Sequence, residues 1–386
     1  MVTIDLWVKD GYISTPDGNS LYFWGFSRTA DGPPQLPGPH LVVRQGEPVT
    51  VNLVNTLSLY PVSLTFQGQT GVLSAGVPVE PQFDPGGDLV SFVNHAPPGG
   101  GAVSYTFTPD YPGTFLYESG TRPHEQVPMG LYGVMVVRPS DYDPGDPALK
   151  TAYGRNTNTE FDREYVLVTG EIDPEMHCAM EQGKTYPVSR FKPRYWTLNG
   201  RCAPDTMLPD NVPYLPRQPY GAMVMCQPGE KVLMRMAGAG IDHHPLHTHG
   251  NHTRVVAMDG RLLRNDNVDR SFKRFTVLVN AGQTLDQIFE WVGLGYTEDN
   301  PIPTVLPNTR NLGVGDAGWT MWSGSPYLGV KGDIPVGVVS LNEAGEYHFM
   351  LHAHEEHKIT NWGEFPGGMI TMLAVYPFLS PEMGTL

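Results

Sequence analysis

Short stretches in which apolar and polar residues alternate run along most of the chain. In the first half they include EPVTVNLVN, AVSYTFTP, GTFLYES and YGVMVVRP, each rich in β-branched or aromatic residues and bounded by Gly or Pro. A second series contains EYVLVTGEI, EKVLMRMAG, HTRVVAMDG, RFTVLVNAG, TLDQIFEW, EYHFMLHAH and GGMITMLAVYP. Such segments are typical of β-strands, and no long segment has the period of an amphipathic helix. We therefore predict an all-β fold.

The two series of strands are separated by a polar stretch, which predicts two domains. Residues 1–140 would form domain 1, residues 141–162 a linker, and residues 163–386 domain 2; the length also fits two domains. Three segments recur in the same order in both halves: VVRQGEPVTVNLVN and VMCQPGEKVLMRMAG, YPGTFLYESG and EAGEYHFMLHAH, PMGLYGVMVVRP and PGGMITMLAVYP. Such a repeat predicts a duplicated β-sandwich.

Charge and composition exclude some functions. With 25 Lys and Arg against 40 Asp and Glu, the net charge is −15, so the basic footprint of a nucleic-acid-binding protein is missing. No segment reaches the roughly 18 apolar residues of a membrane span. The N-terminal residues lack the apolar core of a signal peptide. The three cysteines have no CxxC spacing and predict neither a disulfide framework nor a zinc ribbon.

Nine of the thirteen histidines lie in two short segments, HHPLHTHGNH and HFMLHAHEEH. His247 and His249 are two residues apart, and so are His352 and His354. Residues at this spacing share one face of a strand, so two neighbouring strands would bring four imidazoles to one point. Imidazole suits copper, zinc, iron and nickel. A single His-x-His pair is also common on ordinary surfaces, but two such pairs on predicted strands favour a metal site.

These motifs resemble those of the multicopper oxidases, which are built from cupredoxin domains. HPLHTHG matches the HPxHxHG motif of that family, and LHAHEEH followed by PGGM is similar to its final HCHxxxHxxxxM motif. QGEPVTVNLVN and GTFLYES followed by GLYGVMVVRP resemble the first domain of the family. The resemblance spans nearly the whole chain, as in two-domain laccases and copper nitrite reductases. It implies two cupredoxin-like Greek-key β-sandwiches and copper as the cofactor.

The resemblance also implies a role for individual histidines. His244 and His357 correspond to type 1 copper ligands, and Met369 falls near the remaining type 1 position. His247 corresponds to the type 2 ligand of the trinuclear copper cluster. His249, His352 and His354 correspond to its type 3 ligands.

Several ligands of the family pattern are missing. The type 1 cysteine is replaced by Ala353, which cannot bind copper, and the thiolate is what makes a blue centre. The first domain has TFQG where the family has HxHG, and YESG where it has YHSH. The residues at the four missing histidine positions are Thr65, Gln67, Glu118 and Gly120. The sequence therefore predicts half of a trinuclear site and no blue copper.

The first domain keeps one further trace of the family. Ser119, His124 and Met129 have the order and spacing of a type 1 loop, with serine in the place of cysteine. An ordinary loop containing one histidine is the simpler interpretation. Glu118 and His124 are nevertheless our candidates for an outer-sphere acid or base beside a metal held by the second domain or by a neighbouring subunit.

Three hypotheses for function remain open. The first is a divergent copper protein, with a mononuclear or dinuclear histidine-ligated site and a role as an oxidoreductase. The second is a structural or assembly protein, or a copper carrier, on a cupredoxin scaffold. The third is zinc, but four histidines would close a tetrahedral zinc site and leave no position for catalysis.

The resemblance also suggests partners. It implies a small-molecule or metal-ion substrate together with dioxygen, a homo-oligomer such as a trimer, and a place outside the cytoplasm. The absence of a signal peptide in the sequence leaves the compartment open.

Overall fold

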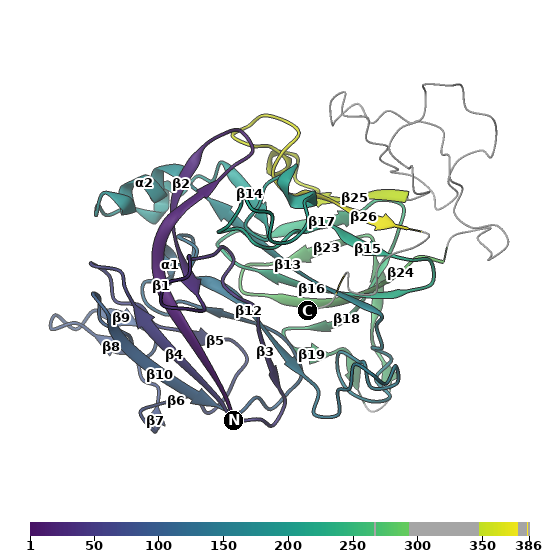
Figure 1. Cartoon of the computed structure of the whole chain (residues 1–386), viewed down its shortest axis with the longest axis horizontal. Helices are drawn as coiled ribbons and strands as arrows, with labels where there is room; N and C mark the ends of the chain where they lie inside the picture. The colour runs from purple at the N-terminus through teal and green to yellow at the C-terminus, as the bar shows by residue number, and fades with distance from the viewer. Residues whose placement is uncertain (266–267, 293–346, 377–383, 385–386) are drawn as a thin grey trace.

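The computed structural model describes residues 1–265, 268–292, 347–376 and 384. Figure 1 shows two β-rich halves side by side, with the N-terminal strands in purple and blue and the later strands in green and yellow. Each half contains two sheets. The prediction of an all-β chain with two cupredoxin-like sandwiches is therefore confirmed.

Residues 1–138 form the first sandwich. Its sheets have the strand orders β2-β1-β4-β10-β6-β7 and β3-β12-β11-β5, with a small β8-β9 pair. The strands are β1 (Val2–Ser14), β2 (Ser20–Ser27), β3 (Leu41–Arg44), β4 (Val49–Asn55), β5 (Thr65–Phe66), β6 (Leu73–Ser74), β7 (Val77–Pro78), β8 (Gln82–Phe83), β9 (Leu89–Ser91), β10 (Gly101–Phe107), β11 (Gly113–Glu118) and β12 (Tyr132–Arg138). Buried and half-buried residues alternate along β4, as its sequence pattern predicts.

Residues 163–376 form the second sandwich in the parts that are described. Its sheets have the orders β14-β13-β16-β24-β18-β19, with β22 pairing β18, and β15-β26-β25-β17-β23; β20 and β21 form a separate pair. The strands are β13 (Arg163–Ile172), β14 (Tyr195–Leu198), β15 (Val224–Cys226), β16 (Lys231–Gly238), β17 (His244–Thr248), β18 (Thr253–Met258), β19 (Arg261–Leu262), β20 (Arg264–Asn265), β21 (Val268–Asp269), β22 (Phe272–Arg274), β23 (Thr276–Val279), β24 (Thr284–Glu290), β25 (Tyr347–Ala353) and β26 (Ile370–Val375).

The two sandwiches repeat one strand order. The sheet β3-β12-β11-β5 corresponds to β15-β26-β25-β17, and β2-β1-β4-β10-β6-β7 corresponds to β14-β13-β16-β24-β18-β19. The similar sequence segments therefore occupy equivalent strands, namely β4 and β16, β11 and β25, and β12 and β26. This confirms the duplication predicted from the sequence.

Helices are short in the described residues: α1 (Pro123–Gln126), α2 (Pro174–Glu181) and the 3₁₀ turns η1 (Val188–Arg190), η2 (Asp205–Met207) and η3 (Glu356–Ile359). The strand patterns did not predict α2, which lies beside β2 in Figure 1. It begins after Asp173, whose carboxylate accepts hydrogen bonds from the backbone nitrogens of Glu175 (3.0 Å) and Met176 (3.4 Å). Within the described ranges, no helix is long and apolar enough to cross a membrane.

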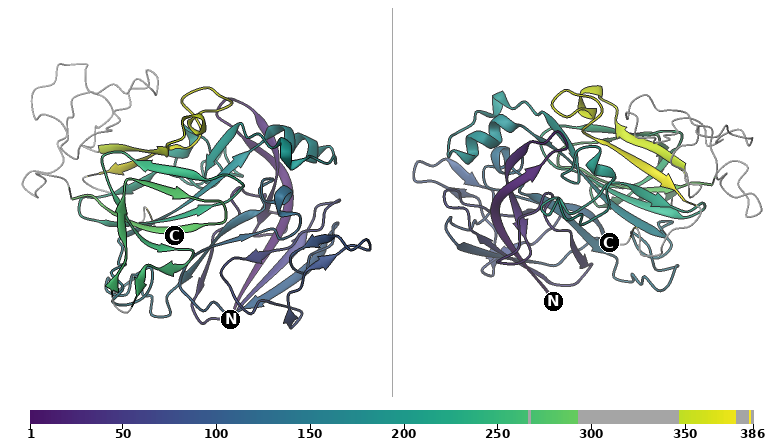
Figure 2. Two further views of the ribbon diagram at one scale, coloured as in Figure 1. Left: turned by 180° about the vertical axis from the view of Figure 1, so that it is seen from behind. Right: turned by 45° about the horizontal axis from the view of Figure 1, so that its top comes forward.

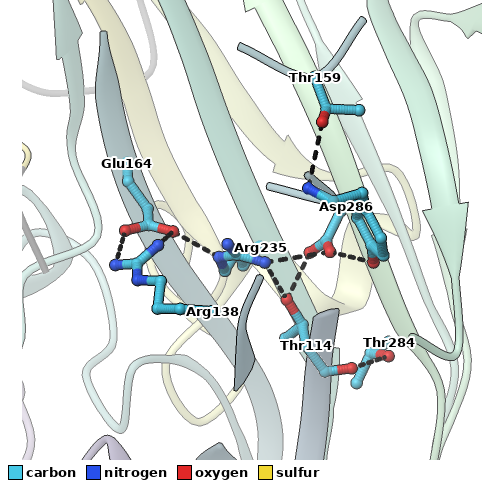
Figure 3. A network of polar contacts seen from close by, with 8 residues as sticks. Thr114, Arg138, Thr159, Glu164, Arg235, Thr284 and Asp286 are labelled. Carbon is cyan, nitrogen blue, oxygen red and sulfur yellow. Dashed lines mark hydrogen bonds and ion pairs between the residues drawn. The ribbon is translucent and has the colours of Figure 1, made fainter. Parts of the chain in front are cut away.

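A buried network of ion pairs joins the two sandwiches (Figure 3). Glu164 on β13 accepts hydrogen bonds from Arg138 on β12 at 2.7 and 2.5 Å, and from Nε of Arg235 on β16 at 2.5 Å. Arg235 also donates to Asp286 on β24 at 3.2 Å and to Thr114 on β11 at 2.9 Å. Burial alone would raise the pKa of Glu164, but the guanidinium charges of Arg235 and Arg138 outweigh it and lower the pKa to about 2.

The segment predicted as a linker, 141–162, is partly buried between the halves. Tyr153 donates its hydroxyl hydrogen to Asp286 at 2.5 Å, and Ala152 and Phe161 pack into a small cluster with Leu233 of the second sandwich. The polar composition of the segment concealed these few anchoring residues. The domain boundaries at residues 140 and 162 stay a prediction.

Replacing Glu164 by glutamine should strongly destabilise the protein. The change removes a charge that two buried guanidinium groups share, and breaking a buried ion pair in this way costs about 3–5 kcal/mol. The free energy of unfolding in urea measures the loss.

Glu160→Gln is the matched control. Glu160 is about one-third exposed and lies 3.9 Å from Lys231, so its replacement should change the free energy of unfolding by about 1 kcal/mol or less. Equal effects of the two substitutions would show that the network does not stabilise the fold.

Candidate metal centre

Two adjacent strands place the histidines of the second sandwich. β17 pairs antiparallel with β25, and His247 lies directly opposite His352. Leu246 and Leu351 point the other way, into the main core of the sandwich. The backbone nitrogen of His249 donates to the carbonyl of Met350 at 2.9 Å, which continues the pairing beyond β17. The alternation along both strands therefore brings the imidazoles to the outer face of the sheet.

The four predicted histidines do come together. The ring centroid of His247 lies 4.8 Å from that of His249, 5.7 Å from that of His352 and 5.0 Å from that of His354. The rings of His249 and His352 are 5.0 Å apart, and those of His352 and His354 are 5.3 Å apart. The Nε2 atoms of His249 and His352 are separated by only 2.9 Å.

The environment lowers the pKa of three of the four imidazoles. Burial, together with the neighbouring rings of His352, His247 and His354, lowers the pKa of His249 to about 4. Burial is also the main reason why the pKa values of His247 and His352 are lowered. Metal binding needs the neutral imidazole, and the lowered pKa values of His247, His249 and His352 favour that form.

Hydrogen bonds orient two of the rings. Nδ1 of His352 lies 2.8 Å from the carbonyl oxygen of Ala353 and donates its proton there, which leaves the Nε2 lone pair directed at Nε2 of His249. Nδ1 of His247 lies 2.8 Å from the hydroxyl of Thr276 on β23. His354 is half exposed, with Nδ1 3.4 Å from Glu356. Such outer partners fix the tautomer and direction of metal-binding histidines.

One pair of nitrogens in the cluster has the spacing of two ligands of a single metal ion. In the described residues, no group of three or more His, Cys, Asp or Glu side chains is arranged to hold a metal ion as it stands. However, when two nitrogens bind one ion at about 2.0–2.1 Å with a right angle between the two bonds, the nitrogens lie ~2.9 Å from each other. His249 and His352 have this spacing. The rings of His247 and His354 lie beside this pair, with centroids 5.7 and 5.3 Å from that of His352.

The residues at the type 1 positions lie apart from this cluster. His244 faces the interior, is fully buried, and its Nε2 lies 2.7 Å from Glu171 of β13. Its Nδ1 is buried without a hydrogen-bond partner in the described part of the chain. His357 is exposed and its ring meets the edge of Trp196 at 5.1 Å, while Met369 is fully buried in the core. Metal binding by His244 and His357 stays a prediction.

In the first sandwich, other residues occupy the positions that correspond to the clustered histidines of the second sandwich. Glu118 on β11 lies opposite Thr65 on β5, as His352 lies opposite His247 in the second sandwich. Nε2 of Gln67 donates to the Glu118 carboxylate at 2.8 Å, and burial raises the pKa of Glu118. His124 lies in α1 with a half-exposed side chain, 3.8 Å from Glu125. Within the described ranges, neither Glu118 nor His124 has a recorded contact with the four imidazoles.

The type 1 loop of the first sandwich is filled by ordinary packing. Ser119 is buried and donates its hydroxyl hydrogen to the Gln126 side chain at 2.6 Å, while Met129 lies in the core. The loop is therefore held by side-chain hydrogen bonds and apolar contacts.

Sequence reasoning missed the partners of the histidines. Thr276 opens a predicted strand, and only the pairing of β23 with β17 shows that it reaches His247. Glu171 carried a usable signal, because an acid inside the apolar segment VLVTGEI is rarely buried without a partner.

Comparison with known proteins supports the family resemblance. Residues 29–142 match the family model described as multicopper oxidase. A search of curated proteins returns no match.

Solved structures share the fold over the whole chain. A multicopper oxidase called mgLAC has a TM-score of 0.63 at 19% identity, covering 99% of this chain and 88% of its own. A blue copper oxidase from Nitrosomonas europaea gives 0.62 at 18% identity, with 100% and 91% covered. A copper nitrite reductase from the same organism gives 0.60 at 19% identity, with 100% and 98% covered.

The family model matches the first sandwich by sequence, and the structural likeness extends over both sandwiches in their chain order. The resemblance stated from the histidine motifs is thereby confirmed: a multicopper oxidase model matches residues 29–142, and the chain shares its fold with multicopper oxidases and a copper nitrite reductase.

Proposed function

We propose that this chain is a copper-binding protein that holds one copper ion, or a pair, at His247, His249, His352 and His354. The observation that carries the proposal is the gathering of four rings on one sheet face, with two Nε2 atoms 2.9 Å apart. Neutral imidazoles and fixed outer partners at His352 and His247 support it.

Copper is a better fit than zinc. A complete set of four histidines closes a tetrahedral zinc site, which would leave zinc a purely structural role. Imidazole sites follow the Irving–Williams order, in which copper binds most tightly among the divalent first-row metals. Two of the structural relatives are named as a blue copper oxidase and a copper nitrite reductase.

A blue centre is not part of the proposal. Ala353 points into the core and is fully buried, so no thiolate stands between His352 and His354. Bound copper would supply a one-electron redox centre without the cysteine that links a blue site to the cluster. Dioxygen reduction to water by three coupled coppers is therefore outside what this donor set supports.

The chain contributes orientation and proton handling around that site. The Ala353 carbonyl fixes the His352 tautomer, and Thr276 holds His247. Glu118, with a raised pKa, and His124 are the proposed acid–base groups, for a small-molecule or metal-ion substrate with dioxygen. In a trimer like those of two-domain relatives, they would come from a neighbouring subunit; we also propose a place outside the cytoplasm.

The alternative is a structural protein or copper carrier. The first domain favours this alternative, because it has other residues at the four ligand positions: Thr65, Gln67, Glu118 and Gly120. Gln67 and Glu118 are hydrogen-bonded to each other rather than directed at a metal site. In this case metal binding would add to the stability of the fold without turnover.

Protein prepared with copper should retain it and show the EPR signal of a nitrogen-ligated Cu(II). The visible spectrum should lack the intense band of a copper–thiolate bond, because Ala353 replaces the cysteine. Metal analysis and EPR of the same sample give both results. Absence of copper after such preparation would overturn the proposal, and an intense blue colour would contradict the type 1 assignment.

Substitutions in and beside the cluster should weaken copper binding by different degrees. His352→Ala removes a ligand and should abolish tight binding. Thr276→Val removes the partner of His247 and should weaken copper affinity by about 10–100-fold. Competition with a chelator measures both, and His95→Ala, outside the cluster, should bind copper like the wild type. Unchanged affinity in His352→Ala would place the copper elsewhere.

An oxidase assay separates an enzyme from a scaffold. If the copper site is catalytic, oxidation of a phenol or a metal ion by the wild type should fall to background in His352→Ala and persist in His95→Ala. Activity that survives in His352→Ala would contradict catalysis at this site, and no activity in a copper-loaded wild type would favour the scaffold.

A further inference from the structure

The sheet face that carries the histidines also carries a row of methionines. Met350 lies between His348 and His352 on the outer face of β25, while Phe349 and Leu351 point into the core. Met350 pairs directly with Met372 on β26. Figures 1 and 2 show β25 and β26 next to each other at this side of the molecule. Imidazoles and thioethers therefore share one surface of one sheet.

Four methionines pack together beside the main core, and Met350 also contacts that core: Met207, Met223, Met350 and Met372. Met207 comes from η2 and Met223 from the residue before β15, so four separate segments converge. Met372 and Met207 are buried, and Met223 and Met350 are partly exposed. Apolar cores are usually packed with leucine, isoleucine and valine, whose rotamers are better defined than those of methionine.

A cavity of about 790 Å³ reaches two of the four methionines, Met207 and Met223. Met207, Met223 and Met225 line it together with His40 and Tyr220. This volume lies within the range of about 300–1,000 Å³ that is usual for small-ligand sites. Met207 and Met223 are therefore reachable from the cavity, while Met372 is buried behind them.

The same cavity contains a nitrogen donor without a partner. Nε2 of His40 is buried and makes no hydrogen bond in the described part of the chain. The His40 ring stacks on Tyr220 with centroids 4.0 Å apart, which fixes its plane. Burial lowers the pKa of His40 to about 4, so the ring is neutral at physiological pH. A buried polar atom left unpaired is costly, and a bound ligand would offset that cost.

We propose that Met207, Met223, Met350 and Met372 form a second metal site, which binds a soft monovalent cation, Cu(I). Thioether sulfur is a soft ligand that selects Cu(I) over harder divalent ions. Met350 is two residues from His352, about 6.6–6.8 Å along the strand, so the two sites are neighbours with different donor sets. The thioether site does not require the imidazole site to hold copper.

Anaerobic titration of the full chain with Cu(I), in competition with a Cu(I) chelator, tests the site. Copper K-edge X-ray absorption of the loaded protein should show sulfur neighbours. Met350→Leu with Met372→Leu should remove those neighbours and weaken Cu(I) binding at this site at least tenfold. Leucine is close to methionine in volume, so the fold should persist.

Two controls make the result specific. Met135→Leu with Met234→Leu changes two fully buried core methionines and should leave Cu(I) affinity unchanged. His352→Ala should keep the sulfur-bound Cu(I) even though it disrupts the imidazole site. The proposal is overturned if wild-type Cu(I) has only nitrogen neighbours, if both methionine pairs lower affinity equally, or if His352→Ala removes the sulfur signal. Each of these results leaves Cu(II) binding at the imidazoles to be judged separately.

Discussion

The candidate site depends on the register between β17 and β25. Because His247 lies opposite His352, the two-residue period of a strand places four imidazoles outside and Leu246, Leu351 and Ala353 inside. A slip by one residue would bury the histidines and expose the core. The same register directs Met350 outward, so the imidazole cluster and the thioether cluster follow from one pairing.

The interface between the sandwiches holds the architecture together independently of the histidine cluster. The Arg138–Glu164–Arg235–Asp286 network fixes the sandwiches together through charges that are expensive to bury unless all are paired. In the described part of the chain, none of its ion-pair partners is one of the four clustered histidines. The joining of the sandwiches therefore does not depend on which residues stand at the positions of Thr65 and Glu118.

Local spacing predicted the fold class, the main strands and the four-imidazole cluster, because each His-x-His pair needs only its own strand. The features it missed depend on contacts between distant segments. Met207, Met223 and Met372 become neighbours of Met350 only once η2, β15 and β26 are assembled, so in the sequence they resemble ordinary core residues. The Tyr153 anchor in the polar segment 141–162 was hidden for the same reason. His244 was assigned by family position, and the structure adds that it faces Glu171 in the interior.

Anomalous diffraction at the copper edge, from crystals of the full chain grown with copper, tests the central claim most directly. Our account predicts copper within bonding distance of His249 and His352, with His247 and His354 turned toward it. Copper bound only at other residues, or four imidazoles with no metal between them in copper-saturated crystals, would contradict it.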